Sequence, residues 1–444
     1  MARKARDSRA KIEIRRAREF IAPTTQNYGF VPDPKKSKGC WVWNIDGEKY
    51  FDAHSGPGVF NIGHKHPKFV AAMCEGIYKM FGFGANEYPN RESNDLAEKL
   101  ISISPGNFKK RVFFCSSGTE SVEAAIRAAQ IHRLTPTMMA FEKTFHGRTS
   151  GARTLTDRAH VTKYSYPAFP VIRLPFPEEG SEMGDPLIFM KHVRRMLSAV
   201  NLGEVAALFW EPIQGEGGIR ITSRPAFKAL MDEIIAPKKI LLVADEVQTF
   251  SRTGKWFAAE HYDVEPDIIC LAKALGGGAP IGATIMRSEV CWPEGGLYSN
   301  TFGGNPFCSA CALKTLEIME KENLITRAEN LGELFHQKFY KAASSGCVDL
   351  YTTHYVSTSG VAIYIVSGGL GLMRKIVFSK FGNNEPVPEF RDRVKEEAFR
   401  RRILLMPAGD SALRIMPPLV VSEQEIKWLA NELAEAIIAV VKTG

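Results

Sequence analysis

Short apolar runs alternate with amphipathic stretches through the middle of the chain. Two stretches, 120–133 and 225–235, carry apolar residues at helical spacing, and we expect each to form a helix. The apolar runs between them are rich in β-branched and aromatic residues, which predicts buried strands at 111–115, 205–210, 239–244, 268–271 and 281–286. This alternation predicts an α/β fold whose mostly parallel sheet is covered on both faces.

The two ends of the chain follow a different pattern. Residues 38–51 read as a hairpin around Asp46-Gly47, a strong turn signal, and the last amphipathic helix is expected at 423–441. We therefore predict a large central domain and a smaller α+β domain built from both termini. The expected boundaries are 61–326 for the large domain and 1–60 with 327–444 for the small one.

Charge is concentrated at the N-terminus. The 444 residues carry a net charge of +8, and residues 1–20 hold eight basic and three acidic side chains, so most of the excess lies there. This segment reads as a solvated leader, with a membrane-surface helix or a nucleic-acid arm as alternatives. The rest is nearly balanced, and no apolar run approaches the length of a membrane span. We expect no nucleic-acid or membrane partner.

The cysteines indicate the compartment. Eight cysteines are scattered through the chain, several among apolar neighbours, as buried free thiols are. This predicts a reducing environment, and we expect the protein in the cytoplasm. Cys308 and Cys311 have C-x-x-C spacing, but no second pair stands near them, so no metal site is predicted.

A loop of small residues separates the strand predicted at 111–115 from the following helix. It reads Cys115-Ser-Ser-Gly-Thr-Glu120, in which Ser117 and Glu120 have capping-box spacing. A helix N-terminus offers unpaired N–H groups and a positive dipole end, which attract anions. The loop is therefore either an ordinary helix cap or an anion site.

An acidic residue ends the apolar strand predicted at 239–244. The segment is Ala244-Asp-Glu-Val-Gln248. Ligands of open α/β sheets bind at the carboxyl ends of strands, and a buried carboxylate needs a partner. Asp245 is a candidate ligand contact, with a helix cap as the alternative.

A lysine stands in a similar position two residues after the strand predicted at 268–271. Lys273 precedes the glycine run Gly276-Gly-Gly278. Burial lowers the pKa of a lysine and makes its neutral amine a nucleophile. The alternative is a lysine that extends its amine to solvent at a strand end.

In this order and spacing, the three segments resemble the class III (subgroup II) aminotransferases, pyridoxal 5′-phosphate (PLP) enzymes of fold type I. This family includes 4-aminobutyrate, ornithine and acetylornithine aminotransferases. The resemblance covers nearly the whole chain. Further segments similar to family signatures are Gly63-His64 with Pro67, Phe145-His-Gly-Arg-Thr149, Glu211-Pro-Ile-Gln-Gly-Glu-Gly-Gly218, Arg252-Thr-Gly254, Thr301-Phe-Gly-Gly-Asn-Pro306 and Leu413-Arg-Ile-Met-Pro-Pro418.

The resemblance implies PLP as the cofactor and gives its contacts positions in this sequence. Lys273 is expected to form the Schiff base with the cofactor aldehyde and to carry the substrate proton. Asp245 is expected to pair with the pyridine nitrogen and keep it protonated, so that the ring is an electron sink. The other implied contacts are Gly118 and Thr119 at the phosphate with Ser117 beside them, Phe145 and Val247 on the ring faces, Gln248 at the ring hydroxyl, His146 beside the ring, and Thr301 at the neighbouring subunit's phosphate.

The resemblance also implies how substrates are held. A 2-oxoglutarate-dependent enzyme must hold two carboxylates, and arginine gives bidentate geometry to each. By resemblance, Arg148 binds the distal carboxylate and Arg414 the α-carboxylate. Glu216 is the implied gate, which pairs with Arg414 while a donor with a terminal amine is bound.

Two segments depart from the family pattern. The family usually has Q-x-G-x-x-R-T-G after the aspartate strand, whereas Gln248-Thr-Phe-Ser-Arg-Thr-Gly254 is one residue shorter and lacks that first glycine. We expect this loop to turn differently. Pro57 stands where related enzymes carry a side chain at the substrate mouth, so no anchor for a donor's distal amine is assigned.

The expected reaction transfers an amino group from a 4-aminobutyrate- or ornithine-like donor to 2-oxoglutarate, giving an aldehyde and glutamate. Some members of this family are amino-acid racemases with the same motifs, and the sequence leaves this alternative open. A racemase would form the D-amino acid without any keto acid. The implied role of Thr301 predicts a homodimer or a dimer of dimers.

Overall fold

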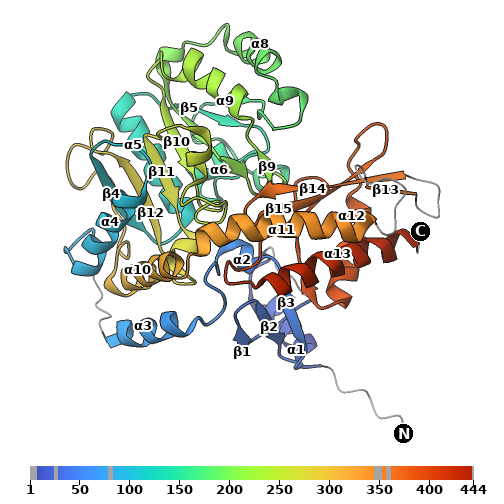
Figure 1. Cartoon of the computed structure of the whole chain (residues 1–444). Coiled ribbons are helices and arrows are strands. Elements are labelled where there is room, and N and C mark those ends of the chain that lie inside the picture. Colours follow the sequence, from blue (N-terminus) through green and yellow to red (C-terminus); the bar gives the residue numbers. More distant parts are fainter. Residues whose placement is uncertain (1–7, 25–28, 79–83, 345–352, 357–361, 443–444) are drawn as a thin grey trace.

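A seven-stranded sheet forms the centre of the molecule (Figure 1). The computed structural model describes residues 8–24, 29–78, 84–344, 353–356 and 362–442. In spatial order the strands are β4 (Lys110–Cys115), β12 (Gly282–Arg287), β11 (Ile268–Leu271), β10 (Leu241–Asp245), β7 (Val205–Trp210), β5 (Thr137–Phe141) and β6 (Val171–Leu174). The strand and α/β predictions are thus confirmed.

Six strands of this sheet run parallel to one another and one runs against them. β12 is antiparallel to both β11 and β4, whereas the other neighbouring pairs are parallel. Only residues 272–281 connect β11 to β12, and a parallel return needs a longer crossover. The short connection that carries Lys273 therefore fixes the direction of β12.

Helices cover both faces of the sheet, as the fully buried β7 and β10 require. α5 (Gly118–Arg133) packs against β11 and β12, and it includes the helix expected at 120–133. On the other face, side chains of α8 (Pro186–Leu197) and α9 (Arg224–Leu230) share a core with Trp210 and Leu242. The helix expected at 225–235 is α9 followed by a π-helical turn at Met231–Ile235.

Residues from both ends of the chain meet beneath the central sheet (Figure 1). One sheet has the order β1 (Pro32–Lys38), β2 (Trp41–Asn44), β3 (Lys49–Asp52) and β16 (Ile403–Leu404). A second has the order β13 (Thr353–Val356), β14 (Ala362–Leu370), β15 (Met373–Lys380), β18 (Ala412–Ile415) and β17 (Met406–Ala408). The hairpin expected around Asp46-Gly47 is present as β2 and β3. The domain boundaries remain a prediction.

Helices complete the terminal part of the molecule. α13 (Glu423–Lys442), the expected last helix, packs against α11 (Leu324–Ser344) and α12 (Pro388–Arg400). Within the basic leader, the structure describes residues from 8 onward, and these include the exposed helix α1 (Arg9–Phe20), which buries no residue. The other α-helices are α2 (Ser55–Gly58), α3 (Pro67–Tyr78), α4 (Arg91–Ile103), α6 (Ser150–Leu155), α7 (Ala159–Thr162) and α10 (Pro306–Lys321), and β8 (Ile213–Gln214) pairs with β9 (Arg220–Ile221).

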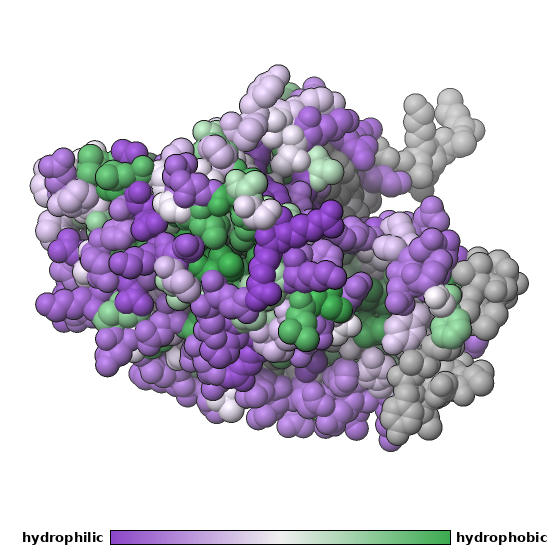
Figure 2. Space-filling view, turned by 90° about the horizontal axis from the view of Figure 1, so that it is seen from above, coloured by the Kyte–Doolittle hydropathy of each residue, from purple (hydrophilic) through white to green (hydrophobic). Residues whose placement is uncertain are grey.

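The surface is mostly hydrophilic. Figure 2 shows separate apolar patches among polar and charged residues on the face seen from above. Within the described part of the chain, no helix is both long and apolar enough to cross a membrane.

Candidate active site

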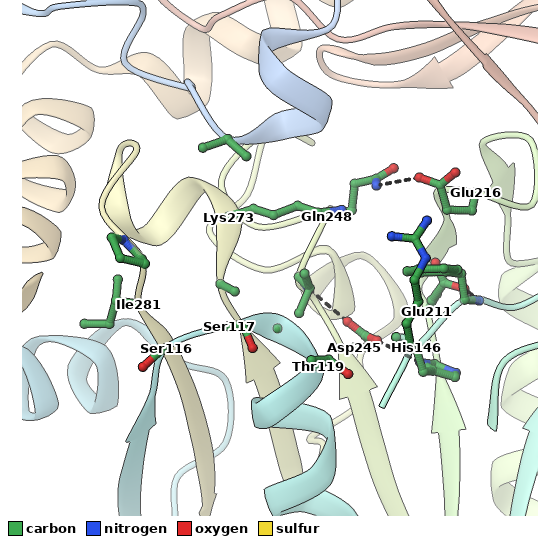
Figure 3. Close-up of a pocket in the computed structure, with 18 of the residues that line it drawn as sticks. Ser116, Ser117, Thr119, His146, Glu211, Glu216, Asp245, Gln248, Lys273 and Ile281 are labelled. Carbon is green, nitrogen blue, oxygen red and sulfur yellow. Dashed lines mark hydrogen bonds and ion pairs between the residues drawn. The ribbon is translucent and has the colours of Figure 1, made fainter. Parts of the chain in front are cut away.

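A pocket of about 410 Å³ opens at the carboxyl ends of β10 and β11 (Figure 3). Every residue predicted for the site lines it except Arg414 and Thr301. The predicted residues that line it are Ser117, Gly118, Thr119, Phe145, His146, Arg148, Glu216, Asp245, Val247, Gln248 and Lys273. Side chains separated by up to 156 positions are thus brought to the sheet edge where open α/β folds bind ligands.

Lys273 follows β11 and begins the 3₁₀ turn Lys273–Gly276. Its φ of +41° lies in the left-handed region, which is costly for a residue with a side chain and is typical of functional positions. Burial lowers the pKa of the amine, and the charge of Arg414 lowers it further, while Glu216 and Asp245 oppose the shift. The arrangement favours the neutral, nucleophilic amine.

Asp245 ends β10 and is held by two hydrogen bonds. Its Oδ1 accepts the N–H of Val247 at 3.1 Å, and its Oδ2 lies 2.7 Å from Nδ1 of the buried His146. The carboxylate is 5% exposed and faces the pocket, so it can pair with a cationic ring nitrogen of a ligand. The carboxyl end of a strand, not a helix cap, positions this acid.

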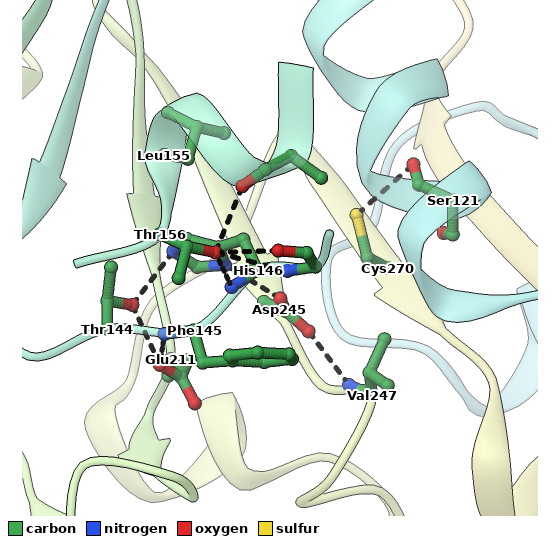
Figure 4. Close-up of polar contacts among 12 residues, drawn as sticks. Ser121, Thr144, Phe145, His146, Leu155, Thr156, Glu211, Asp245, Val247 and Cys270 are labelled. Carbon is green, nitrogen blue, oxygen red and sulfur yellow. Dashed lines mark hydrogen bonds and ion pairs between the residues drawn. The ribbon is translucent and has the colours of Figure 1, made fainter. Parts of the chain in front are cut away.

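Glu211 is a pocket residue that the sequence analysis did not assign. It directly follows β7, and its buried carboxylate accepts the N–H group of Phe145 at 2.9 Å (Figure 4). It also accepts the N–H group of Gly215 at 3.0 Å. Burial raises its pKa, and the charge of Asp245 raises it further. The signal in the sequence was the same as for Asp245: an acid immediately after a strongly apolar strand.

The loop before α5 is a helix cap. Ser117 Oγ accepts the N–H of Glu120 at 3.3 Å, and the Glu120 carboxylate accepts the N–H of Ser116 at 2.7 Å. The capping prediction is confirmed, with the glutamate bonded one residue earlier than in a standard capping box. Gly118 and Thr119 form the first turn of α5 and line the pocket, so their N–H groups are available to an anion there. The anion site itself remains a prediction.

Glu216 and Arg414 form a bidentate ion pair at the pocket wall. The two carboxylate oxygens each lie 2.7 Å from a guanidinium nitrogen, and Arg414, on β18, is 2% exposed. Burial alone would raise the pKa of Glu216, but the charge and hydrogen bonds of Arg414 lower it to about 2. Gln248 Oε1 accepts a third bond from Arg414 at 3.3 Å.

Arg148 and Thr301 lie in different surroundings. Arg148 is exposed at the pocket, with its guanidinium carbon 5.4 Å from the centroid of the Phe145 ring. Thr301 is exposed on the loop before α10 and does not line the pocket of its own chain. Its expected contact with a neighbouring subunit remains a prediction.

The two segments that depart from the family pattern lie beside the pocket. The loop after Gln248 turns at Ser251, whose φ of +64° is left-handed without a glycine. Pro57 lies in α2, and the adjacent Val59 supplies an apolar lining to the pocket. The Val59 side chain itself offers no polar group to a charged distal amine.

Comparisons with known proteins identify the family. The aminotransferase class-III profile matches residues 23–437. The chain is 34% identical to the acetylornithine aminotransferase of Methanosarcina mazei, covering 93% of each chain. It is 35% identical to the putrescine aminotransferase of Pectobacterium atrosepticum, covering 95% of this chain and 87% of that protein. A Bacillus anthracis aminotransferase structure superposes with a TM-score of 0.85 at 25% identity, covering 98% of this chain and 100% of that one.

The chain belongs to the class III aminotransferases. It is a PLP-dependent enzyme of fold type I whose substrates are an amino acid and a keto acid. The pocket fits this cofactor, because it combines a lysine amine of lowered pKa, a buried carboxylate and a helix N-terminus in one cavity. The predicted family, fold and cofactor are confirmed.

Proposed function

We propose that this aminotransferase transfers the terminal amino group of an ω-amino acid, of the 4-aminobutyrate or ornithine type, to 2-oxoglutarate. The products are an aldehyde and glutamate. The closed ion pair between Glu216 and Arg414 is the observation that carries this proposal. It neutralises the arginine that would otherwise lie unpaired against the carbon chain of a donor with no carboxylate at that end.

In this proposal PLP supplies the electron sink, and residues of the protein bind PLP and transfer the protons. Lys273 binds the cofactor covalently and carries the substrate proton, for which its lowered pKa suits it. Asp245 holds the proton on the pyridine nitrogen, with His146 beside the ring. The phosphate is held at the start of α5 by Ser117, Gly118 and Thr119. The ring lies between Phe145 and Val247, and its hydroxyl forms a hydrogen bond with Gln248.

The two arginines serve the acceptor. Arg148, at the open side of the pocket, binds the distal carboxylate of 2-oxoglutarate, and Arg414 binds the α-carboxylate once Glu216 has moved away. The same site therefore accepts a substrate with one carboxylate and a substrate with two. The gate favours a donor whose amine is distant from its α-carboxylate.

The relatives support a terminal-amine donor. Similar proteins are named acetylornithine aminotransferase and putrescine aminotransferase, and both names denote substrates with a terminal amine. The apolar Val59 at the substrate mouth is compatible with an uncharged carbon chain. Acetylornithine therefore joins 4-aminobutyrate and ornithine among the donors to test.

We propose further that Thr301 completes the phosphate site of a second copy in a homodimer. Its position on an exposed loop, outside its own pocket, supports this assignment. The proposed enzyme thus has active sites built from two subunits.

A donor panel tests the reaction. Purified enzyme with PLP is incubated with 2-oxoglutarate and, in turn, 4-aminobutyrate, ornithine, acetylornithine, putrescine and L-alanine, and glutamate is measured. The proposal expects glutamate from at least one terminal-amine donor and much less from L-alanine. Glutamate from L-alanine alone would contradict the donor class. If a single L-amino acid gave the D-amino acid without any keto acid, the enzyme would be a racemase and not a transaminase.

A further inference from the structure

A line of buried hydrogen-bonding groups connects Asp245 to Glu211 (Figure 4). Asp245 Oδ2 lies 2.7 Å from His146 Nδ1, His146 Nε2 lies 2.9 Å from Thr144 Oγ1, and Thr144 Oγ1 lies 2.7 Å from Glu211 Oε1. Thr144 is 1% exposed, His146 3% and Glu211 6%. Asp245, His146 and Glu211 line the pocket, whereas Thr144 does not, so Thr144 is the member of this line that is shielded from the ligands.

With Asp245 ionised, as its proposed pairing with the ring nitrogen requires, two arrangements of hydrogens satisfy these distances. In the first, protonated Glu211 donates to Thr144 Oγ1, the Thr144 hydroxyl donates to His146 Nε2, and His146 Nδ1–H donates to Asp245. In the second, His146 carries a hydrogen on both nitrogens, its Nε2–H donates to Thr144, and Thr144 donates to ionised Glu211. The two arrangements differ in the position of one proton. When Glu211 passes its hydrogen to Thr144 and Thr144 passes its own hydrogen to His146, the first arrangement becomes the second.

The first arrangement has fewer buried charges. It contains one ionised group, Asp245, whereas the second contains three in the same dry space, although both have a total charge of −1. The charges that face Glu211 are those of His146, Asp245 and Lys273. Burial raises the pKa of Glu211 most and the negative charge of Asp245 adds to it, whereas the charge of His146 and the hydrogen bonds from Phe145 and Thr144 lower it. The net shift is upward, toward the neutral acid.

We propose that Glu211 is a positioning residue for Asp245. As a neutral acid it directs the Thr144 hydroxyl hydrogen to His146 Nε2 and so keeps His146 neutral, with its hydrogen on Nδ1. A neutral imidazole donates a weaker hydrogen bond to Asp245 than an imidazolium does, so the carboxylate keeps more of its charge for the ring nitrogen. This inference rests on the proposed pairing of Asp245 with the pyridine nitrogen.

Variants of Thr144 test the connection without touching the pocket. Thr144→Val removes the hydroxyl and keeps the shape, Thr144→Ala removes it with less crowding, and Thr144→Ser keeps it. Each holoenzyme is reconstituted with PLP labelled with ¹⁵N in the ring, and the ¹⁵N chemical shift reports whether that nitrogen is protonated. Asp245→Asn shows the shift when the carboxylate is absent, and circular dichroism confirms that each variant is folded.

We expect Thr144→Val and Thr144→Ala to move the ¹⁵N resonance toward that of Asp245→Asn, and Thr144→Ser to match the parent. The kcat should fall about 10-fold with little change in either KM, since such supporting residues typically contribute 10- to 100-fold. A merely structural role for Thr144 would leave the ¹⁵N shift unchanged. If Asp245→Asn moved the resonance and the folded Thr144 variants did not, the inference would be wrong. If Asp245→Asn also left it unchanged, the proposed role of Asp245 would fail first.

Discussion

Lys273 concentrates several unusual properties in one side chain. It has a left-handed backbone, a buried amine and a lowered pKa, and Glu216, Asp245 and Glu211 all act on that amine electrostatically. A lysine that only reached solvent at a strand end would need none of these. We interpret the strained turn as the means by which the amine is aimed into the pocket.

Replacing Lys273 tests the assignment directly. Borohydride reduction of the holoenzyme followed by peptide mapping should place the pyridoxyl group on Lys273. Lys273→Ala should lose the absorbance of the covalently bound cofactor and nearly all turnover, because no other lysine of the described residues lines the pocket. Labelling of a different lysine in the parent enzyme would overturn the assignment.

The sequence predicts residues with independent roles better than residues whose roles depend on a hydrogen-bond network. Asp245 and Lys273 are recognisable because each follows an apolar strand and belongs to a family motif. Glu211 also follows such a strand, but its importance depends on Thr144 and His146, which lie 67 and 65 positions earlier. Only the fold brings those three together, so no local pattern marks the set.

The start of α5 determines how closely a ligand approaches the sheet edge. A Cβ placed on Gly118 would lie 2.8 Å from Cγ1 of Val247, a residue of the loop after β10. Glycine therefore allows the helix N-terminus and the β10 loop to enclose the pocket from adjacent positions. The two residues that meet at this contact, Gly118 and Val247, are 129 positions apart in the sequence.

Gly118→Ala should weaken PLP binding about 10-fold, because overpacking of this kind costs roughly 1 to 3 kcal/mol. Quenching of tryptophan fluorescence during PLP titration of the apoenzyme measures the affinity. Gly295→Ala is the matched control, since a Cβ there meets nothing within 4 Å. Equal affinities for the two variants would show that the contact between Gly118 and Val247 is not restrictive.

The loop after β10 is anchored by a buried acid. Glu246 accepts the N–H of Ala259 at 2.7 Å and the hydroxyl of Thr249, and burial raises its pKa from 4.5 to about 7. The folded enzyme therefore binds this proton more tightly than the unfolded chain. The resulting stabilisation is present below pH 4.5, declines as the pH rises and is lost above about pH 7.

Glu246→Gln should remove this dependence on pH. A neutral amide keeps both hydrogen bonds, because the Thr249 hydroxyl can rotate to accept. The variant should match the parent near pH 5 and exceed it at pH 8, with a difference of about 3 kcal/mol. Thermal unfolding of both holoenzymes at the two pH values gives the comparison. A constant difference between them would mean that Glu246 is ionised throughout.

At the level of elements, the strands were the most predictable part of the fold. β7 and β11 have the predicted bounds because every side chain in them is buried and apolar. The alternating pattern predicts a mostly parallel sheet but does not mark β12 as antiparallel, because the direction of this strand depends on the length of its connection. The sequence did not predict the five-stranded sheet that carries Arg414. Its strands β17 and β18 are only three and four residues long, and α12 separates them from β14 and β15 along the chain.

The whole molecule brings a central and a C-terminal segment of the chain to one site. Glu216 follows a strand of the central region, whereas Arg414 lies on β18 in a sheet formed by C-terminal residues. The gate is therefore also a contact between the central and terminal parts of the chain. Gly409 N–H donates to the carbonyl oxygen of Glu216 at 2.9 Å and strengthens the same contact.

A composite active site predicts complementation between inactive variants. Lys273→Ala and Thr301→Ala subunits are mixed under conditions that allow subunit exchange, which labelled subunits can verify. Each mixed dimer holds one site with both lesions and one with neither. Activity should therefore rise above that of either homodimer. Verified exchange without recovery would contradict a shared site.

The gate gives the most direct test of the proposed reaction. Glu216→Ala leaves Arg414 unpaired against the carbon chain of a terminal-amine donor, which costs about 3 kcal/mol or more. Stopped-flow single turnovers measure the donor and acceptor half-reactions separately, with Glu385→Ala, which breaks an exposed ion pair with Lys380, as the control. We predict that Glu216→Ala slows the donor half-reaction about 100-fold and leaves the 2-oxoglutarate half-reaction unchanged or faster. Equal slowing of both half-reactions would contradict the gate and with it the proposed donor class.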